Sequence, residues 1–411
     1  MSVLSFGCRL NIQEGEAIRA HLAAAGLQDT LVVNTCAVTS EAEKQARQAI
    51  RRLKRENPQA KIVVTGCAAQ ISPDSYAAMP EVHRVLGNAE KLRADSWMHQ
   101  ASAVGDIMAA RQPETLPEEP GQDFRQRPRA YLEIQQGCDH RCTFCIIPYG
   151  RGPSRSQALG AVVERARKLT DQGFREFVLT GVDIVSYGGD LPGRPSLGQA
   201  ARRLLNLVPG IERLRFSSLD PAGIDDDLLR LYAEEPRVMP HAHLSLQAGD
   251  DLILKRMKRR HSRDQALRVA ESLRAARPDI ALGADMIAGF PTEDDAAFMR
   301  GADLVDEIGL AYLHVFPFSA RQGTPAARMP QLPMDLRRAR AAELRRRGEA
   351  GLRRHLAQRS GKAASILVEQ PGLGRDETYA PVKLTGIHDK GSVIATQVLA
   401  ARDGGLWLEA A

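Results

Sequence analysis

The chain has 411 residues, of which 43% are hydrophobic and 26% are charged, so it is long enough for two or three domains with a substantial core. No apolar run approaches the length of a membrane-spanning helix, and the first residues lack the basic and apolar regions of a secretory signal. We therefore expect a cytoplasmic protein that has no membrane as a partner. The formal net charge of +6 permits a phosphate-rich partner without demanding one.

The first hundred residues alternate between short apolar runs and segments with a helical period. Because strands that alternate with helices form parallel sheets, we expect a parallel α/β domain here. The strands are expected at 3–6, 31–33 and 62–64, and the helices at 13–25 and 41–55.

Residues 111–128 are rich in proline and charge and have no apolar period, so we interpret them as a linker. From residue 131 the strand–helix alternation resumes, and its strand–helix units fit a partial barrel of parallel strands that is open on one side. The strands are expected at 131–135, 176–180, 213–217, 241–246, 282–287 and 312–316, and helices at 158–172, 264–276 and 294–307, with a long Arg-rich helix at 335–358.

The tail changes character, with β-type runs at 365–368, 381–384 and 392–398 between glycine-containing turns, and this pattern predicts a small β-barrel. Basic runs occur at 255–260 and along the Arg-rich helix, where a solvated helical face is a commoner explanation than RNA contact. The predicted division of the chain is 1–110, a linker at 111–128, 129–359, and 360–411.

Six cysteines matter more for function than the charge does. Disulfides are rare in the reducing cytoplasm, so metal binding or catalysis is the better interpretation. Three of the cysteines form a tight group, CDHRCTFC at 138–145, directly after the first strand of the central region. Thiolates are the usual ligands of iron–sulfur clusters, and three of them leave one iron of a four-iron cube open. An open metal position suggests a bound substrate, as in catalytic zinc sites.

Two other interpretations use the same residues. Cys142 and Cys145 alone have the spacing of a dithiol redox pair, which leaves Cys138 unexplained. Together with His140 the three cysteines have the composition of a zinc site, although this histidine lies inside the first spacing rather than at the separated position usual for structural zinc. Both interpretations stay open on spacing alone.

A CxxxCxxC group after the first strand of such a βα region resembles the radical S-adenosylmethionine (SAM) superfamily. The resemblance implies that Cys138, Cys142 and Cys145 hold a catalytic [4Fe–4S] cluster whose open iron binds the amino and carboxylate groups of SAM. One electron then cleaves SAM to methionine and a 5′-deoxyadenosyl radical. By the same resemblance, Phe144 lies beside the adenosine.

The other cysteines, Cys8, Cys36 and Cys67, are 28 and 31 positions apart, too far for a linear metal motif. Each follows an expected strand by two or three residues, and the carboxyl ends of parallel strands share one edge, where open α/β folds bind ligands. We therefore expect the three thiols to converge. A lone cysteine is usually just a small core residue, but three at one edge argue against coincidence.

The sequence around these cysteines reads FGCRLN at 6–11, NTCAVT at 34–39 and GCAAQ at 66–70, and it resembles the N-terminal domain of the methylthiotransferases. In that family such a triad holds an auxiliary [4Fe–4S] cluster that takes part in delivering sulfur. The tail, GRDETYAPV at 374–382, resembles the TRAM domain, an RNA-binding barrel. Residues 362–411 hold five Lys and Arg against six Asp and Glu, so counterion release would contribute little to RNA binding there.

Two strand segments, HLSLQ at 243–247 and GADMIAG at 283–289, fall where the superfamily contacts the ribose and adenine of SAM. The resemblance thereby implicates Ser245, Gln247 and Ile287 in binding SAM. Each segment is equally consistent with an ordinary core strand.

The superfamily's Gly-Gly-Glu after the second strand is replaced by LTGVD at 179–183, in which Gly181 is the remaining candidate for SAM contact. No residue can therefore be assigned to the methionine amino group. Arg151 and Arg155, after the cysteine loop, are candidates for contact with phosphate or the SAM carboxylate, although an exposed arginine is more often only solvated.

The resemblance implies that a C–H bond is replaced by C–SCH₃, with one SAM methylating a sulfur at the auxiliary cluster and a second supplying the radical. A nonpolar C–H bond has no acidic proton, so a general base cannot activate it. The motifs GCRLN and NTCAVT most resemble the branch that acts at C2 of N6-threonylcarbamoyladenosine at position 37 of tRNA. The implied partners are the anticodon loop of tRNA, a reductant such as flavodoxin or ferredoxin, and a sulfur donor.

Alternative substrates within the family are isopentenyladenosine in tRNA and an aspartate of a ribosomal protein. A hypothesis of another class is a non-catalytic iron–sulfur sensor that binds RNA. It predicts cluster incorporation without reductive cleavage of SAM.

Overall fold

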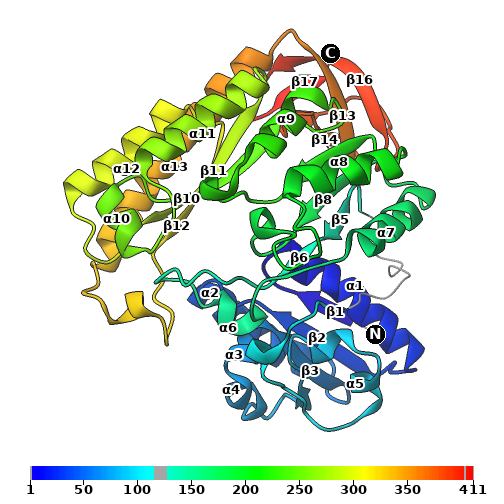
Figure 1. The fold of residues 1–411 in the computed structure, drawn as a ribbon. Coiled ribbons are helices and arrows are strands. Elements are labelled where there is room, and N and C mark those ends of the chain that lie inside the picture. The colour runs from blue at the N-terminus through cyan, green and yellow to red at the C-terminus, as the bar shows by residue number, and fades with distance from the viewer. Residues whose placement is uncertain (1, 115–126, 402–403, 411) are drawn as a thin grey trace.

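The structure, a computed structural model, describes residues 2–114, 127–401 and 404–410. The N-terminal part, the central part and the C-terminal part follow one another through the molecule, with the central part in the middle (Figure 1). Most of the linker predicted at 111–128 lies outside the described residues. Within the described residues, no helix combines the length and the apolar character needed to cross a bilayer.

The N-terminal part is a parallel sheet in the order β1-β2-β3-β4. Val3 pairs with Val32, and Val32 pairs with Val63, so buried valines fill the centre of the sheet. The predicted strands and helices are present, and β4 is an addition. The bounds are β1 Ser2–Ser5, α1 Arg9–Ala24, β2 Thr30–Thr35, α2 Ser40–Glu56, β3 Lys61–Gly66, α3 Cys67–Ile71, α4 Pro73–Ala77, β4 Arg84–Val85 and α5 Asp95–Met98.

The central part contains two parallel sheets, β5-β8-β9 and β10-β11-β12. Leu219 joins them, because its N–H donates to the carbonyl of His243 and its carbonyl accepts from the N–H of Ser245, at 2.7 and 2.8 Å. The predicted partial barrel is therefore confirmed. The strands are β5 Ala130–Glu133, β8 Glu176–Thr180, β9 Arg213–Phe216, β10 His241–Gln247, β11 Ala281–Ala288 and β12 Tyr312–Pro317, with a small antiparallel pair β6 Gln135–Gln136 and β7 Arg155–Ser156.

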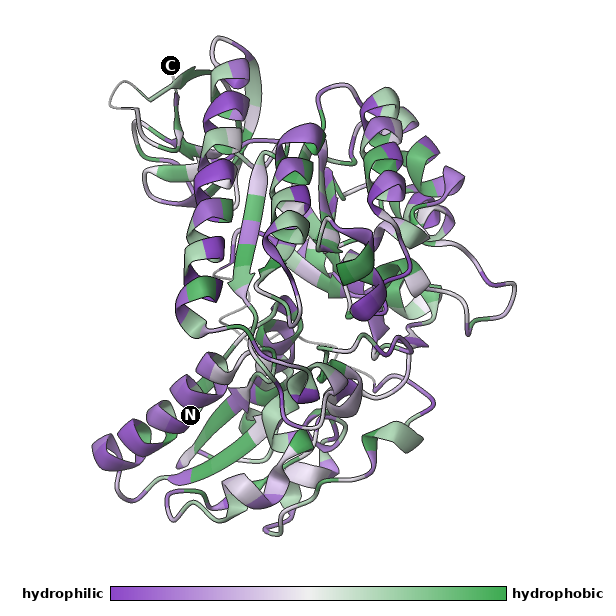
Figure 2. Ribbon diagram, turned by 90° about the vertical axis from the view of Figure 1, so that its left-hand side faces the viewer, coloured by the Kyte–Doolittle hydropathy of each residue, from purple (hydrophilic) through white to green (hydrophobic). Residues whose placement is uncertain are grey.

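Helices cover the outside of the central sheets (Figure 1), and their polar faces point away from the apolar strands (Figure 2). Apolar residues of strands and helices share one large core, as expected for amphipathic helices packed on a sheet. The helices are α6 Ile147–Arg151, α7 Leu159–Asp171, α8 Leu197–Leu207, α9 Asp226–Glu234, α10 Asp251–Arg256, α11 Arg263–Ala276, α12 Asp295–Ile308 and α13 Met334–Arg359.

The long helix α13 is the predicted Arg-rich helix, and its arginines differ in environment. Arg346 is exposed and pairs with Glu343 on the same helix. Arg340 is buried and pairs with Glu293 at 2.9 Å, and Arg337 is buried with its guanidinium on backbone carbonyls. Interpreting the whole run as a solvated face was therefore wrong for Arg337 and Arg340, which anchor the helix to the barrel.

The C-terminal part is a closed barrel in the order β13-β14-β15-β17-β16, as predicted. It covers the amino ends of the central strands: Arg213, the first residue of β9, donates to the carbonyl of Ser365 at 2.9 Å, and Tyr312, the first residue of β12, donates to the carbonyl of Thr378 at 3.0 Å. The bounds are β13 Ala363–Gln370, β14 Leu373–Arg375, β15 Pro381–Lys383, β16 Val393–Ala400 and β17 Leu408–Ala410.

Candidate active site

The structure brings Cys8, Cys36 and Cys67 together at the carboxyl edge of the N-terminal sheet. Cys8 lies between β1 and α1, Cys36 follows β2, and Cys67 begins α3 directly after β3. The charge of Cys67 acts on both Cys8 and Cys36, and that of Cys8 acts on Cys36, so the three sulfurs lie close together. Gly7 makes the approach possible: its φ is +86°, and any side chain there would collide with the sulfur of Cys36.

Cys36 and Cys67 are buried, whereas Cys8 is accessible to solvent even though surrounding protein desolvates its thiol. Burial raises the pKa of Cys8, and it raises the pKa of Cys36 to about 12. These groups are therefore protonated when free, and a bound metal must displace their protons.

Hydrogen-bond donors surround the sulfurs of the trio. The N–H of Val38 reaches the Sγ of Cys36 at 3.5 Å, and the Sγ of Cys67 has Nε of Arg151 at 3.3 Å and Nδ2 of Asn88 at 3.7 Å. N–H groups aimed at sulfur and a buried cation stabilise metal-bound thiolates. The donor set therefore fits an iron–sulfur cluster.

Arg151 is held by a buried ionic network. It pairs with Glu14 at 2.5 Å and donates to Oδ1 of Asn11 at 2.6 Å, and Lys91 pairs with the same glutamate at 2.8 Å. Arg155 is also buried and donates to the backbone carbonyl of Arg151. The hypothesis that Arg151 and Arg155 contact phosphate or SAM was therefore wrong. Both side chains are buried, and their guanidinium groups are hydrogen-bonded to other residues of the protein.

The second trio lies in the loop after β6. The backbone N–H of Thr143 donates a hydrogen bond to the carbonyl of Met257, and this bond fixes the loop against the end of α10. Burial raises the pKa of Cys138 to about 12 and that of Cys145 to about 11, and each of these thiols is affected by the charge of Cys142. The guanidinium of a neighbouring arginine, Arg259, lies 3.8 Å from the Sγ of Cys142.

The two trios face each other across the boundary between the N-terminal and central parts. The charge of Cys67 acts on Cys145, and α3, which begins at Cys67, packs against α6, which begins two residues after Cys145. A side chain at Gly150 in α6 would lie 3.2 Å from the Cβ of Cys67. Metal clusters held by the two trios would thus be neighbours.

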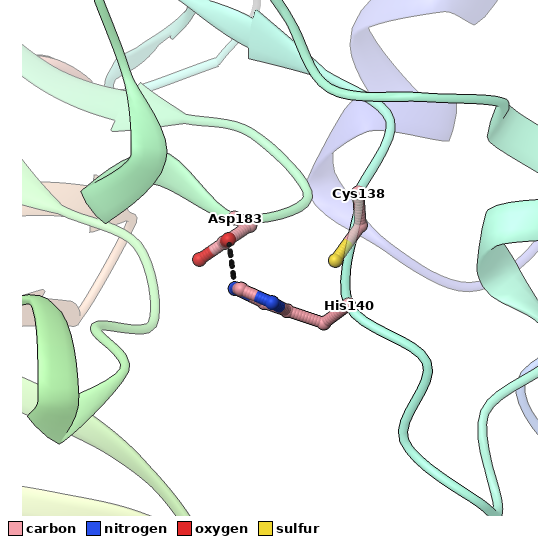
Figure 3. Close-up of side chains that lie close together, drawn as sticks. All are labelled: Cys138, His140 and Asp183. Carbon is pink, nitrogen blue, oxygen red and sulfur yellow. Dashed lines mark ion pairs between the residues drawn. The ribbon is translucent and has the colours of Figure 1, made fainter. Parts of the chain in front are cut away.

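Figure 3 shows a pair that the sequence did not single out, His140 and Asp183, beside Cys138. The Nε2 of His140 lies 2.9 Å from Oδ2 of Asp183, and the hydroxyl of Ser186 donates to the same oxygen at 2.5 Å. The ligand atoms of Cys138, His140 and Asp183 lie within 4.8 Å of one another, a spacing that is compatible with a metal ion. In the sequence, the motif LTGVD that contains Asp183 was the only pointer to this residue. That Asp183 reaches the cysteine loop is seen only in the fold.

The residues predicted to contact SAM lie at the carboxyl ends of their strands. Gly181 directly follows β8, and a side chain there would collide with Gln135. Ile287 packs with Phe144 against a common apolar cluster. These positions place them near the cysteine loop, and their roles stay predictions.

Ser245 and Gln247 lie at the end of β10. The carbonyl of Ser245 accepts from Arg259, at 2.5 Å, and this is the arginine that approaches Cys142. Gln247 has φ of +71° beside a break in the β10–β11 register, a backbone strain of the kind found at binding sites.

Comparison with known proteins agrees with this geometry. Residues 132–305 match the Radical SAM superfamily, and residues 1–87 match Uncharacterized protein family UPF0004. Among solved structures, the radical S-adenosylmethionine methyltransferase TsrM from Kitasatospora setae, with cobalamin and a [4Fe-4S] cluster bound, is similar in fold, with a TM-score of 0.55 and 14% identity over 77% of this chain and 70% of that one.

Curated relatives match almost end to end. The threonylcarbamoyladenosine tRNA methylthiotransferase MtaB of Rickettsia prowazekii (strain Madrid E) is 46% identical over 98% of this chain and 95% of its own length. MtaB of Thermotoga maritima is 34% identical over 93% and 90%, and the tRNA-2-methylthio-N(6)-dimethylallyladenosine synthase of Novosphingobium aromaticivorans is 34% identical over 97% and 94%.

Fold and cysteine loop together define a radical SAM enzyme, a class that works with SAM and a [4Fe–4S] cluster. The full-length matches refine this class, and the chain belongs to the radical SAM methylthiotransferase family. It is therefore a transferase, which sets aside the non-catalytic sensor.

Proposed function

We propose that the chain replaces the C2 hydrogen of N6-threonylcarbamoyladenosine at position 37 of tRNA by a methylthio group. The observation that carries this proposal is the 46% identity over 98% of the chain to a relative named for threonylcarbamoyladenosine in tRNA. The relative named for dimethylallyladenosine is less similar, at 34% identity. An RNA substrate also fits the mild positive charge of the chain.

We propose that Cys138, Cys142 and Cys145 hold the catalytic [4Fe–4S] cluster. The N-terminal trio, Cys8, Cys36 and Cys67, is assigned to an auxiliary [4Fe–4S] cluster. Their support is the convergence of each trio, the N–H donors on the sulfurs and the proximity of the two sites. When bound, these groups and SAM supply the electron, the radical and the sulfur chemistry.

The protein's own groups orient the cofactors. Phe144, Gly181, Ser245, Gln247 and Ile287 are assigned to the SAM site. The carboxylate beside the cysteine loop, that of Asp183, is assigned to the methionine amino group, since it is a buried anion that accepts hydrogen bonds at this edge. Arg151 balances negative charge at the auxiliary trio.

The proposal includes partners and a division of labour. The anticodon loop of tRNA is the substrate, a flavodoxin or ferredoxin supplies electrons, and a separate donor supplies sulfur in the cytoplasm. Residues 1–110 carry the auxiliary site, 129–359 carry the radical SAM site, and 360–411 form the TRAM-like part, with a linker at 111–128.

The test is complementation of a strain that lacks this activity, followed by mass spectrometry of its tRNA nucleosides. We expect the mass of N6-threonylcarbamoyladenosine to rise by one methylthio group in place of hydrogen. A rise on the isopentenyl nucleoside, or on a ribosomal-protein aspartate, would refute the substrate assignment. Anaerobic reduction with SAM must also yield 5′-deoxyadenosine, and its absence would refute radical chemistry.

A further inference from the structure

The inner face of the β10-β11-β12 sheet carries a polar cluster that the proposed cofactor sites do not use. Alternate residues of these strands, such as Leu244 and Ala284, pack outward into the core, so the residues between them face the interior of the partial barrel. Among these inward residues, the ligand atoms of His243, Asp285 and His314 lie within 4.8 Å of one another.

One carboxylate oxygen organises this cluster. Oδ1 of Asp285 lies 3.0 Å from Nε2 of His243 and 3.2 Å from Nδ1 of His314. Although burial opposes it, hydrogen bonds from the two rings hold the pKa of Asp285 well below its ordinary value, so the carboxylate is ionised. Gly283 leaves room for the ring of His243, because a side chain there would lie 2.7 Å from its Nδ1.

The position of the proton on the ring of His314 follows from its hydrogen bond to Asp285. Because Nδ1 of His314 donates to Asp285, the other nitrogen, Nε2, is an acceptor when the ring is neutral. The side chain of His314 is 63% exposed, so this acceptor is open to a ligand.

Arg9 carries a positive charge that acts on His241, an inward-facing residue of β10. It directly follows Cys8, is half-buried, and has no hydrogen bond or ion pair with any residue that the structure describes. The pKa of His241, two residues before His243, is lowered by burial and also by the charge of Arg9. A cation partly withdrawn from water is stabilised by an anion, and no residue among those that the structure describes supplies one to Arg9.

We infer that Arg9 binds the carboxylate of the substrate's threonyl group and that His314 accepts a hydrogen bond from its hydroxyl. Asp285 and His243 are positioning residues that orient His314. This inference rests on the proposed function, because the threonylcarbamoyl group supplies both a carboxylate and a hydroxyl. An isopentenyl group has neither, so these residues would select the substrate.

A divalent metal on His243, Asp285 and His314 is the competing interpretation. The 3.2 Å contact between Nδ1 of His314 and Oδ1 of Asp285 is a direct hydrogen bond. The positive charge of Arg9, which acts on His241 of the same strand as His243, favours an anion rather than a second cation. Zinc or another non-iron metal retained in proportion to protein, and lost in His314→Phe, would overturn the inference.

The test uses the reconstituted holoenzyme and anticodon stem-loop RNAs. One RNA carries the natural threonylcarbamoyl group, a second carries its methyl ester, and a third carries a 2-aminobutyryl group, in which hydrogen replaces the hydroxyl. We expect the wild-type kcat/KM to fall about ten- to hundredfold for the ester and about tenfold for the deoxy RNA. Equal values for all three would overturn the inference.

The variants assign each contact. We expect Arg9→Gln to lose about ten- to hundredfold on the natural RNA but little on the ester, and His314→Phe to lose about tenfold on the natural RNA but little on the deoxy RNA. Losses that are the same on all RNAs would show a structural role. Arg338→Gln, at an exposed position of α13, is the matched control and should retain wild-type values.

Two further readouts separate the possible failures. Iron content and 5′-deoxyadenosine formation without RNA must stay at wild-type levels in both variants. If the wild type modifies the natural RNA without discriminating the ester, this inference fails alone. If it modifies only an isopentenyl RNA, the proposed function fails with it.

Discussion

At the scale of single residues, the pKa values of the cysteine thiols fit metal ligands better than free nucleophiles. Burial raises the pKa of Cys36 and Cys138 to about 12, so the metal-free protein keeps both protonated at neutral pH. Reactive cysteines need the opposite shift. Metal binding must therefore release protons, and cluster assembly becomes more favourable as pH rises.

Gly7 allows the backbone before Cys8 to approach the sulfur of Cys36. Replacing Gly7 therefore tests the auxiliary site. Gly7→Ala places a methyl group against the sulfur of Cys36, so we expect iron to fall from about eight to about four per chain. The matched control is Gly26→Ala, because Gly26 also has a positive φ, +66°, but has nothing within 4 Å of an added Cβ. Iron measured by a colorimetric assay should stay at about eight in the control, and equal losses in both variants would point to backbone strain instead.

Glu133 gives a prediction for pH. Burial, together with the charge of Glu14, raises the pKa of Glu133 to about 7. A carboxyl group whose folded pKa is raised stabilises the fold when protonated, so its contribution is lost as pH rises from about 4.5 through 7. Glu133→Gln removes this dependence.

Between pH 6 and pH 8.5, the free energy of unfolding of Glu133→Gln should rise relative to wild type by about 1 to 2 kcal/mol. Urea unfolding of the anaerobic holoprotein at both pH values measures this difference. A difference that stays constant with pH would show that Glu133 titrates normally.

At the scale of elements, a buried junction joins the barrel to the C-terminal part. Glu176, on β8, lies within 2.7 to 3.0 Å of Arg129, Arg213 and Arg215. Tyr379 lies over the guanidinium of Arg215 at 5.1 Å and over that of Arg129 at 5.4 Å. Arg213 and Arg215 also donate to carbonyls of the C-terminal part. The carboxylate of Glu176 thus orients Arg213 and Arg215, which bind the C-terminal part to the barrel.

Glu176→Gln removes the anion that pairs with Arg213 and Arg215, whereas Arg129 keeps its pair with Glu369 at 2.6 Å. We expect the substitution to lower the free energy of unfolding by about 3 to 5 kcal/mol. Limited proteolysis should release the C-terminal part sooner than in wild type. The control, Glu234→Gln, breaks an exposed pair with Arg202 and should leave the urea midpoint nearly unchanged. A midpoint for Glu176→Gln as high as that of the control would contradict this account.

The elements themselves could largely be predicted from the sequence. Strand β8 was predicted with its observed bounds. A short apolar run that is bounded by polar turns marks a buried strand clearly. Strands β4, β14 and β17 were not predicted, since two or three residues give no period to detect. The start of α1 was placed four residues too late, because Cys8 is not a residue that caps helices with its side chain.

The site was only partly predictable. Convergence of the scattered cysteines followed from the common edge of a parallel sheet. The pairing of Arg151 with Glu14 spans 137 positions, and the approach of Asp183 to the cysteine loop depends on the packing of two separate strand ends. No local pattern encodes such contacts, so they emerge only with the fold.

At the scale of the whole molecule, the central part lies between the other two and contacts both. The N-terminal part places one cysteine trio over the carboxyl ends of the barrel, next to the other trio. The C-terminal barrel covers the amino ends, where Tyr379 stacks on His241 at 5.1 Å. Figure 1 shows this order, with the central part between the other two.

The central claim is that six thiolates are divided between two adjacent clusters with separate tasks. It is tested most directly by replacing Cys8, Cys36 and Cys67 together with alanine and measuring iron and both products in one anaerobic turnover assay. The account predicts about four irons per chain, continued release of 5′-deoxyadenosine, and no methylthiolated nucleoside. Methylthiolated RNA formed by this variant would contradict it.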